Sequence, residues 1–263
     1  MSGILETTSP YSETISNLEK LKLHRISQLF PDYVRMVSEG EKDFSEAMAE
    51  MTRAEVSLLE AKSLERRLRS SGLPFVKTLK DFDWSFQPTV PRALLEELAT
   101  LRFLEQSENV LFVGSPGVGK THLAIALGVE AVKAGREVRF MDCKKLIEDL
   151  REAQAAGMFK KRLKYYARST LLIIDEMGYL DIDEEGTNLF YQLVAARYEQ
   201  RSIIMTTNVG IGGWGKVFGD EVAASAIADR ICHHRKIIKI TCRSYRLKDL
   251  PMEKETTKPK KIE

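Results

Sequence analysis

Short apolar runs alternate with helical patterns along most of the chain. From about residue 75 onward, five runs are rich in aliphatic and β-branched side chains: residues 110–113, 137–141, 171–174, 202–206 and 236–240. Segments with helical spacing of apolar residues fill the gaps between them. Strands that alternate with helices indicate a parallel sheet covered on both faces. We therefore predict an α/β fold with a five-stranded parallel sheet.

The first 72 residues carry helical periodicity without strand patterns. Leucine and isoleucine recur at helical spacing over residues 17–30, which predicts one helix there. A second helix is predicted to extend to about Arg69, and Asp43 with Glu46 resembles a capping box at its start. The apolar stripe of this helix consists of Phe44, Met48, Met51, Leu58 and Leu59. A Gly-Leu-Pro break at residues 72–74 ends it.

These patterns divide the chain into three parts. Residues 1–72 are predicted to form a small all-α domain, which cannot bury much surface alone and is expected to serve in oligomerisation or in contact with DNA or a partner protein. Residues 73–250 are predicted to form the α/β domain. The lysine-rich residues 251–263 are expected to be a disordered basic tail.

The composition narrows the class of protein. The chain has 263 residues, a net charge of +2 and no apolar run approaching membrane-spanning length, so we expect a soluble protein with no membrane partner. The three cysteines, Cys143, Cys232 and Cys242, include no C-x-x-C pair. That spacing favours neither a disulfide framework nor a zinc site, and it agrees with a reducing cytoplasm.

A glycine-rich loop supplies the clearest chemistry. Residues 114–121 match the complete phosphate-binding pattern G-x-x-x-x-G-K-[ST], between an apolar run and a helical segment. Glycines let backbone N–H groups surround phosphates at a helix N-terminus, where the helix dipole favours an anion. Lys120 is expected to reach the β- and γ-phosphates of ATP. The residues predicted to bind the nucleotide here are Gly114, Ser115, Pro116, Gly117, Val118, Gly119, Lys120, Thr121 and His122.

An acidic pair follows the third apolar run. Asp175 and Glu176 come directly after four aliphatic residues, at the carboxyl end of a predicted strand. Ligands bind at this end of the strands in open parallel sheets. We expect Thr121 and Asp175 to hold Mg²⁺ beside the phosphates, and Glu176 to act as the base for the attacking water. The predicted cofactors are therefore ATP and Mg²⁺.

Two further residues are catalytic candidates. Asn208 follows the fourth strand and would orient water beside the acidic pair if the strands are neighbours. Arg230 lies beyond the next helical segment and would complete the site of a neighbouring subunit by stabilising transition-state charge. This arrangement resembles that of AAA+ ATPases. The alternative for Arg230 is a structural ion pair with Asp229 or Asp220.

The chain also resembles the IstB family, the ATPase helpers of insertion-sequence transposases, which are related to DnaC helicase loaders. The resemblance covers about residues 15–250, and its densest motifs are Gly178-Tyr-Leu180, Phe190-Tyr-Gln-Leu193, Arg197-Tyr-Glu199, Thr206-Thr-Asn208, Trp214-Gly215, Phe218-Gly-Asp220, Asp229-Arg230, His233-His234 and Ser244-Tyr-Arg246. Two departures occur: Cys242-Arg243 stands where the family commonly has Gly-Glu, and Met177 replaces a leucine.

The resemblance implies a biological role. It implies a P-loop AAA+ core without a separate lid domain, assembly of a homo-oligomer on double-stranded DNA with ATP, and little dependence on DNA sequence. It further implies that the protein remodels target DNA and delivers it to a partner transposase. A replicative helicase loader of the DnaC type shares the catalytic elements and is the close alternative.

A basic segment is the candidate DNA contact. Cations and an aromatic side chain mix on a predicted helix before the third strand, in Lys160, Lys161, Arg162, Lys164 and Tyr165. Such a mixture suits phosphate contact and stacking. An ordinary solvated helix face is the alternative, and the family resemblance favours DNA binding over it.

Other positions carry weaker indications. Arg246 is a candidate nucleotide contact in its own subunit. Phe82 and Trp84 precede the core where AAA+ proteins often contact adenine, although packing is the commoner role of such aromatics. His24 and the pair His233-His234 have no carboxylate or cysteine at ligand spacing, which disfavours a metal site.

Two other classes of function remain open from the residues. A small-molecule P-loop kinase would need an acceptor pocket and an arginine-rich lid, and the chain offers Asn208 and Arg230 instead. A nucleotide-gated scaffold without turnover would require a poorly aligned Glu176.

Overall fold

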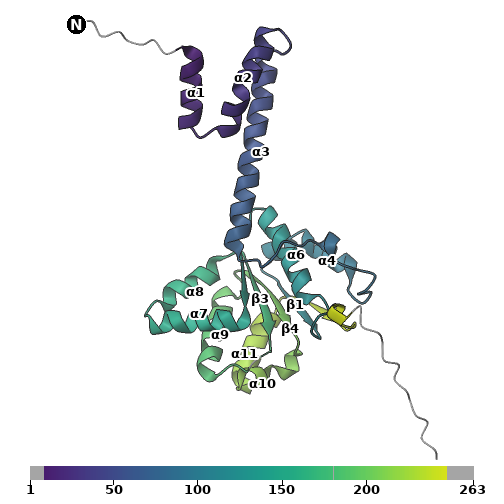
Figure 1. The fold of residues 1–263 in the computed structure, drawn as a ribbon. Helices are drawn as coiled ribbons and strands as arrows, with labels where there is room; N and C mark the ends of the chain where they lie inside the picture. The colour runs from purple at the N-terminus through teal and green to yellow at the C-terminus, as the bar shows by residue number, and fades with distance from the viewer. Residues whose placement is uncertain (1–8, 180, 248–263) are drawn as a thin grey trace, which may run out of the picture. The chain divides into compact units, whose positions relative to one another are not determined.

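The computed structural model describes residues 9–179 and 181–247 (Figure 1). The predicted basic tail at 251–263 lies outside the described residues. The chain divides into two compact units, Met1–Arg66 and Arg67–Glu263, which are described separately below. The predicted domain boundary at residue 72 falls just after the end of a long helix that enters both units.

The first unit is helical. It contains α1 (Pro10–Lys20), α2 (His24–Ser38) and most of α3 (Phe44–Ser71). The prediction of one helix over residues 17–30 is wrong, because Lys22 adopts a left-handed conformation (φ 60°) and separates two helices. Ser9 caps the first of them by accepting a hydrogen bond from the backbone N–H of Ser12.

A buried carboxylate joins two helices of this unit. Glu55 of α3 is 3% exposed and accepts hydrogen bonds from the backbone N–H groups of Arg25 and Ile26, at 2.6 and 2.9 Å. These groups begin α2 and have no partner within that helix, so Glu55 takes the role of its N-cap. Glu55 had no place in the predicted apolar stripe.

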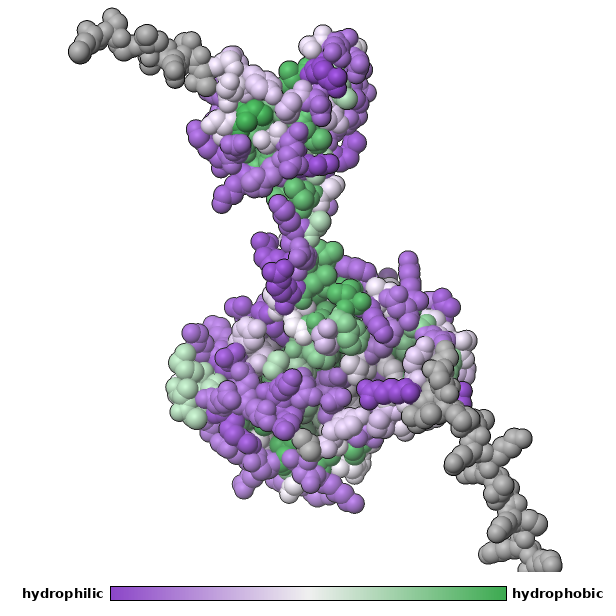
Figure 2. Space-filling model, in the orientation of Figure 1, coloured by the Kyte–Doolittle hydropathy of each residue, from purple (hydrophilic) through white to green (hydrophobic). Residues whose placement is uncertain are grey.

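The predicted stripe of α3 is only partly buried. Met51 is buried, but Phe44 and Leu59 are 67% and 48% exposed. Hydrophobic residues are visible between hydrophilic ones on the face of this unit drawn in Figure 2. The helix therefore keeps apolar side chains in contact with solvent.

The second unit is built on one parallel sheet, as predicted. Its strands lie in the order β2-β3-β4-β1-β5, and every neighbouring pair is parallel. The strands are β1 (Asn109–Gly114), β2 (Val138–Asp142), β3 (Leu171–Met177), β4 (Ser202–Thr207) and β5 (Arg235–Ile240). All five predicted strands are present. The central strands β1, β3 and β4 are mostly buried, whereas the edge strands β2 and β5 are partly exposed.

Helices cover both faces of the sheet (Figure 1). They are α4 (Arg92–Ala99), α5 (Arg102–Glu105), α6 (Lys120–Lys133), α7 (Cys143–Ala155), α8 (Phe159–Arg168), α9 (Glu184–Arg197), α10 (Trp214–Phe218) and α11 (Glu221–Cys232). The short 3₁₀ turns are η1 (Leu79–Asp81), η2 (Ile211–Gly213) and η3 (Tyr245–Leu247). Within the described chain, β5 is followed by η3 alone.

Alternate residues of a central strand serve the two faces. Leu172 and Ile174 of β3 belong to the core beneath α7 and α9 to α11. Ile173 points the other way, toward α6, and comes so close that a side chain at Gly128 would meet its Cδ1 at 2.6 Å. This alternation fixes which residues at the carboxyl end of β3 face the glycine-rich loop.

Candidate nucleotide-binding site

The glycine-rich loop joins β1 to α6 and is held from two sides. Gly117 and Gly119 are left-handed, with φ values of 79° and 96°. A side chain at Gly117 would clash with Ser244, and one at Gly119 would lie 2.7 Å from the ring of Phe82. Glycine is therefore required at both positions by backbone conformation and by space. The N-terminus of α6, at Lys120, faces the loop.

Lys120 lies inside this loop. It is 6% exposed, and its Nζ donates hydrogen bonds to the backbone oxygens of Gly114 and Ser115, at 2.8 and 2.9 Å. Burial lowers the pKa of the Lys120 ammonium, while the charge of Asp175 opposes that shift. Bound phosphates would supply further negative charge and favour the protonated form.

Two hydroxyl groups converge on one carboxylate oxygen near the end of β3. Asp175 Oδ1 accepts hydrogen bonds from the hydroxyls of Thr121, at 2.9 Å, and Thr206, at 2.5 Å. Asp175 is 6% exposed. Carboxylate and hydroxyl oxygens are ligands that Mg²⁺ prefers, so Thr121 and Asp175 are suited to hold this ion. Both residues were predicted, and the structure brings them into direct contact.

Thr206 was not predicted as a site residue. Its hydroxyl also accepts a hydrogen bond from the backbone N–H of Glu176 at 3.0 Å, so it connects both members of the acidic pair to β4. The sequence motif Thr206-Thr-Asn208 contained the signal, because residues two apart in a strand face the same side of the sheet. The side expected for Asn208 is therefore also the side of Thr206.

Glu176 occupies an irregularity in β3. The register between β3 and β4 shifts between Ile174 and Met177, and Glu176 has a φ of 61°. Burial raises the pKa of its carboxyl group, and the neighbouring charges of Asp175 and Asp142 and a side-chain hydrogen bond with Asp142 raise it further. Asp142 ends β2 opposite Asp175. The structure therefore groups three carboxylates at the ends of two adjacent strands.

Asn208 lies beside the turn that follows the acidic pair. A side chain at Gly178 would lie 3.0 Å from Asn208 Oδ1, and this buried oxygen has no hydrogen-bond partner among the described residues. The strands β3 and β4 are neighbours, as the interpretation of Asn208 required. Thr206, and not Asn208, lines the hollow over the loop.

That hollow has a volume of about 370 Å³ and draws on distant parts of the chain. The predicted residues Gly117, Val118, Gly119, Lys120, Thr121, His122, Asp175 and Glu176 line it, together with Phe75, Lys77, Asp81, Phe82, Asp83, Gln87, Tyr179, Thr206, Tyr245 and Arg246. Gly114, Ser115 and Pro116 belong to the loop but do not line the hollow.

Aromatic packing accounts for one side of the hollow. Phe82 is buried and meets both Trp84 and His122 edge to face, with ring centroids 5.0 and 5.3 Å apart. His122 Nε2 lies 3.1 Å from the backbone oxygen of Thr78. Burial lowers the pKa of His122, which favours its neutral form. Phe82 thus packs against Trp84 and His122 and also lines the hollow over the loop.

The segment after β5 closes the other side. The backbone N–H of Tyr245 donates a hydrogen bond to the Gly117 oxygen at 2.8 Å, and Gln87 Nε2 donates to the Arg243 oxygen at 3.2 Å. The charge of Arg246 acts on both Lys120 and Glu176, lowering the pKa of each. Arg246 is therefore positioned at the same hollow as the acidic pair.

Arg230 lies away from the hollow on α11. Its guanidinium stacks on Tyr191, 4.8 Å from the ring centroid, and Nη1 donates to the Ala226 oxygen at 3.0 Å. Among the described residues, no ion pair joins it to Asp229 or Asp220. Asp220 instead caps α11 through the backbone N–H groups of Val222 and Ala223. The structural ion pair considered for Arg230 is therefore not formed.

The basic residues predicted to contact DNA lie on α8 and differ in their exposure and side-chain contacts. Lys160, Lys161 and Lys164 are exposed and form no ion pair in the described part of the chain. Arg162 lies 3.4 Å from Asp149. Tyr165 is half-buried between the guanidinium groups of Arg139 and Arg162, at 4.5 and 5.7 Å from its ring centroid.

A buried arginine fixes the end of α8 to the sheet. Arg197 is fully buried and donates hydrogen bonds to the backbone oxygens of Tyr166 and Ser169, at 2.6 and 3.0 Å, and of Ser202, at 2.6 Å. Burial lowers the pKa of its guanidinium to about 9. Ser202 begins β4, so Arg197 connects the basic helix to the strand that carries Thr206.

Comparison with known proteins agrees with this site. The family model described as IstB-like ATP binding protein matches residues 16–252. The ATP-binding protein of insertion sequence IS21 from Pseudomonas aeruginosa is 42% identical over 232 residues, 88% of each chain. That of insertion sequence IS232 from Bacillus thuringiensis subsp. berliner is 40% identical over 239 residues, 91% of this chain and 96% of the relative.

A solved structure shares the fold. AMPPCP-bound DnaA from Aquifex aeolicus is 23% identical and aligns with a TM-score of 0.52 over 64% of this chain and 51% of the DnaA chain. At this identity the similarity concerns the fold alone. Within the described residues, no helix is both long and apolar enough to span a membrane.

Proposed function

The chain belongs to the family of IstB-like ATP binding proteins, and from this membership we propose that it acts on target DNA during transposition. It is an ATPase of the AAA+ class that is associated with insertion sequences. The proposed activity is ATP-dependent assembly on target DNA, remodelling of that DNA, and its delivery to a partner transposase. The observation that carries this proposal is the similarity to ATP-binding proteins of insertion sequences over almost the whole chain.

The chemistry proposed for the site follows from its oxygen atoms. Thr121 and Asp175 would hold Mg²⁺, which would offset the negative charge of the bound phosphates. Glu176 would accept a proton from water as that water attacks the γ-phosphate, and Thr206 would keep Asp175 and Glu176 in register. Asn208, which follows β4 and does not line the hollow, is kept as the candidate to orient the water.

Completion of the site by a second subunit is the next part of the proposal. Arg230 is half-buried on a helix that does not line its own hollow, which supports a role across an interface between copies of the chain. A homo-oligomer assembled with ATP would bring this guanidinium to the phosphates of a neighbour, where it stabilises transition-state charge.

Contact with DNA is assigned to α8. The exposed ammonium groups of Lys160, Lys161 and Lys164 suit phosphates of either strand and carry no base preference. Arg162 and Tyr165 belong to the same surface, although Asp149 and Arg139 already contact them. The helical first unit is proposed to serve in oligomerisation or in contact with DNA or the transposase, since it exposes apolar side chains.

A replicative helicase loader is the second candidate, because it would use the same catalytic elements; the structure of DnaI shares the fold with a TM-score of 0.52. At 21% identity this similarity concerns the fold alone. The relatives of 40% and 42% identity favour transposition.

The test uses two variants in the complete insertion element. Lys120→Ala should lose ATP binding and transposition together, because it removes the positive charge that would contact the phosphates. Glu176→Gln should bind ATP, assemble on DNA and fail to turn over, because only the water loses its base. Transposition frequency, nucleotide binding and phosphate release are measured for each. Normal transposition by Lys120→Ala, or ATP turnover at the unaltered rate by Glu176→Gln, would contradict the assignment.

A further inference from the structure

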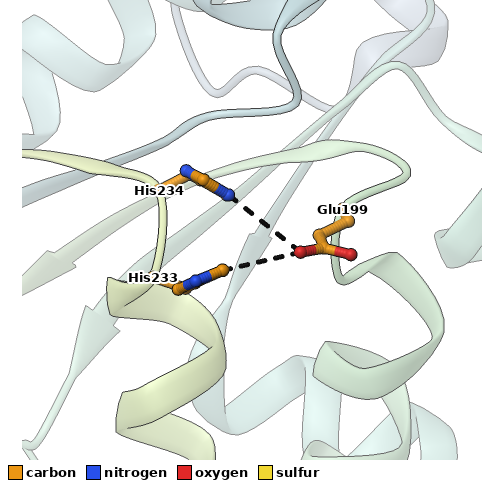
Figure 3. Close-up of side chains that lie close together, drawn as sticks. All are labelled: Glu199, His233 and His234. Carbon is orange, nitrogen blue, oxygen red and sulfur yellow. Dashed lines mark ion pairs between the residues drawn. The ribbon is translucent and has the colours of Figure 1, made fainter.

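We propose that Glu199, His233 and His234 form a binding site for a divalent transition-metal ion, of which Zn²⁺ is the best match. The three side chains point toward one another in Figure 3. Glu199 comes from the turn after α9, whereas the histidines come from the segment that joins α11 to β5. The sequence pattern disfavoured a metal site because the carboxylate is distant in the chain, and the fold supplies it.

The separations of the donor atoms suit one ion. Glu199 Oε1 lies 3.5 Å from His233 Nδ1 and 4.0 Å from His234 Nε2. One donor atom from each of the three residues lies within 4.8 Å of the others. Around a tetrahedral ion with bonds of about 2.1 Å, donor atoms are about 3.4 Å apart. The three side chains are about half exposed, and their rotation would bring the donors to that spacing.

The backbone under the histidines is fixed by a buried residue. The Asn109 side chain donates a hydrogen bond to the Ile231 oxygen at 3.0 Å and accepts one from the Ile203 N–H at 2.8 Å. The backbone N–H of Asn109 donates to the His234 oxygen at 2.8 Å. One residue thus anchors the start of β4 and the segment that carries both imidazoles, which limits the entropy lost on binding an ion.

The turn that carries Glu199 is also held in place. The backbone N–H groups of Gln200 and Arg201 both donate to the Arg197 oxygen at 3.0 Å. The guanidinium of Arg197 binds the Ser202 oxygen just after the turn. Glu199 itself has a φ of 56°, a conformation that a carboxylate-bearing residue seldom adopts without such support. Two anchored backbone segments therefore present the three donors.

The donor set selects the kind of ion. Two imidazoles and one carboxylate bind Zn²⁺ and similar borderline ions, whereas Mg²⁺ and Ca²⁺ prefer oxygen donors throughout. Each of the three side chains is roughly half exposed, so water can complete the coordination. The Tyr198 hydroxyl lies 2.8 Å from His233 Nδ1 and would give up this hydrogen bond when the ion binds.

This site is separate from the nucleotide. Glu199 and His234 precede the first residues of β4 and β5, whereas Asp175 lies near the carboxyl end of β3 and the glycine-rich loop follows β1. Because the strands are parallel, the two sites lie at opposite ends of the strands: the three donors at the amino ends, and the nucleotide-binding residues at the carboxyl ends. An ion held there would tie the end of α9 to the end of α11, the helix that carries Arg230.

The experiment uses the full chain without an affinity tag, freed of metal by a chelator. Zn²⁺ is titrated calorimetrically and in competition with a colorimetric chelator, and thermal unfolding is followed with and without Zn²⁺. The unaltered protein should bind one Zn²⁺ per chain at this site and unfold at a higher temperature when loaded. His233→Ala, His234→Ala and Glu199→Gln should each weaken binding by at least about tenfold, the loss that even an outer-shell partner produces in metal sites.

Matched variants exclude other donors. His24→Ala and Cys232→Ser remove an unrelated imidazole and the thiol next to His233, and both should bind Zn²⁺ as the unaltered protein does. Tyr198→Phe removes the competing hydrogen bond and should bind equally or more tightly. Unchanged Zn²⁺ binding by His233→Ala and His234→Ala would overturn the proposal, as would loss of binding in Cys232→Ser, His24→Ala or Tyr198→Phe.

Discussion

The Thr206 hydroxyl donates its hydrogen to the same Asp175 oxygen that accepts the Thr121 hydroxyl hydrogen. Asp175 is thereby oriented from β4 on one side and from α6 on the other. In metal sites, partners that orient a ligand matter almost as much as the ligand. Thr206 is therefore expected to set how well Asp175 holds Mg²⁺.

Replacing Thr206 by Val should weaken the binding of Mg²⁺ by Asp175. The hydroxyl is lost and the shape is kept, so we expect about tenfold to hundredfold weaker activation by Mg²⁺. ATP turnover is measured across a Mg²⁺ titration. Thr206→Ser retains the hydroxyl and should stay near the unaltered protein. Equal Mg²⁺ dependence in the Val variant would remove Thr206 from the site.

ATP turnover should fall at low pH because Glu176 becomes protonated. Its pKa is raised by burial and by the charges of Asp175 and Asp142, and a base must be deprotonated to accept a proton from water. Activity should thus be lost as pH falls through this raised pKa, at a higher pH than an ordinary glutamate would give. Asp142→Asn removes one negative charge, so the acidic limb of the profile should move to lower pH.

The choice of Asn at position 142 preserves a structural role. Asp142 also caps α7 by accepting a hydrogen bond from the Lys145 N–H at 3.1 Å, and Asn is an equally good cap. Asp220→Asn is the matched control, because Asp220 caps α11 away from the nucleotide hollow. The same pH profile for all three proteins would show that Asp142 does not act on Glu176.

Arg230 is expected to act in a neighbouring subunit. Turnover should rise with protein concentration, since the guanidinium does not line its own hollow. Arg230→Ala and Lys120→Ala should each be inactive alone. Mixed, they should recover part of the activity, because some interfaces combine an intact loop with an intact arginine. Co-assembled mixtures without any recovery at several ratios would return Arg230 to a structural role.

The salt dependence of DNA binding tests whether α8 contacts the phosphates of DNA. Replacing Lys160, Lys161 and Lys164 together by Ala removes three exposed charges, so the slope of log affinity against log salt should fall by up to about three per engaged subunit. Binding to unrelated DNA sequences should weaken equally. An unchanged slope in the triple variant would mean that α8 is an ordinary solvated face.

The strands and the glycine-rich loop were predictable because local physics determines them. A strand buried on both faces reads as a continuous apolar run, and Gly117 and Gly119 occupy conformations that other residues avoid. The pair of Thr121 and Asp175 followed from the same motifs. These features depend on short stretches of sequence.

The errors arose where distant segments meet or where one residue departs from periodicity. Lys22 alone interrupts the helix predicted at 17–30, and periodicity does not register a single left-handed residue. Thr206 was overlooked in favour of Asn208 because the sequence pattern does not show that β4 ends at Thr207, so that Thr206 lies within the strand and Asn208 beyond it. Glu199 reaches the two histidines only through the packing of α9 beside α11.

The loop that is expected to receive phosphates rests on the last described part of the chain. Gly117 is held by Tyr245 and faces Ser244, and β5 pairs with β1 along its whole length. During synthesis, β1 and the loop leave the ribosome long before this support exists. The closing contacts have a large sequence separation, and such contacts form late and slowly in folding. A nascent or truncated chain that ends before residue 241 would therefore carry the whole nucleotide motif and still lack the wall that shapes it.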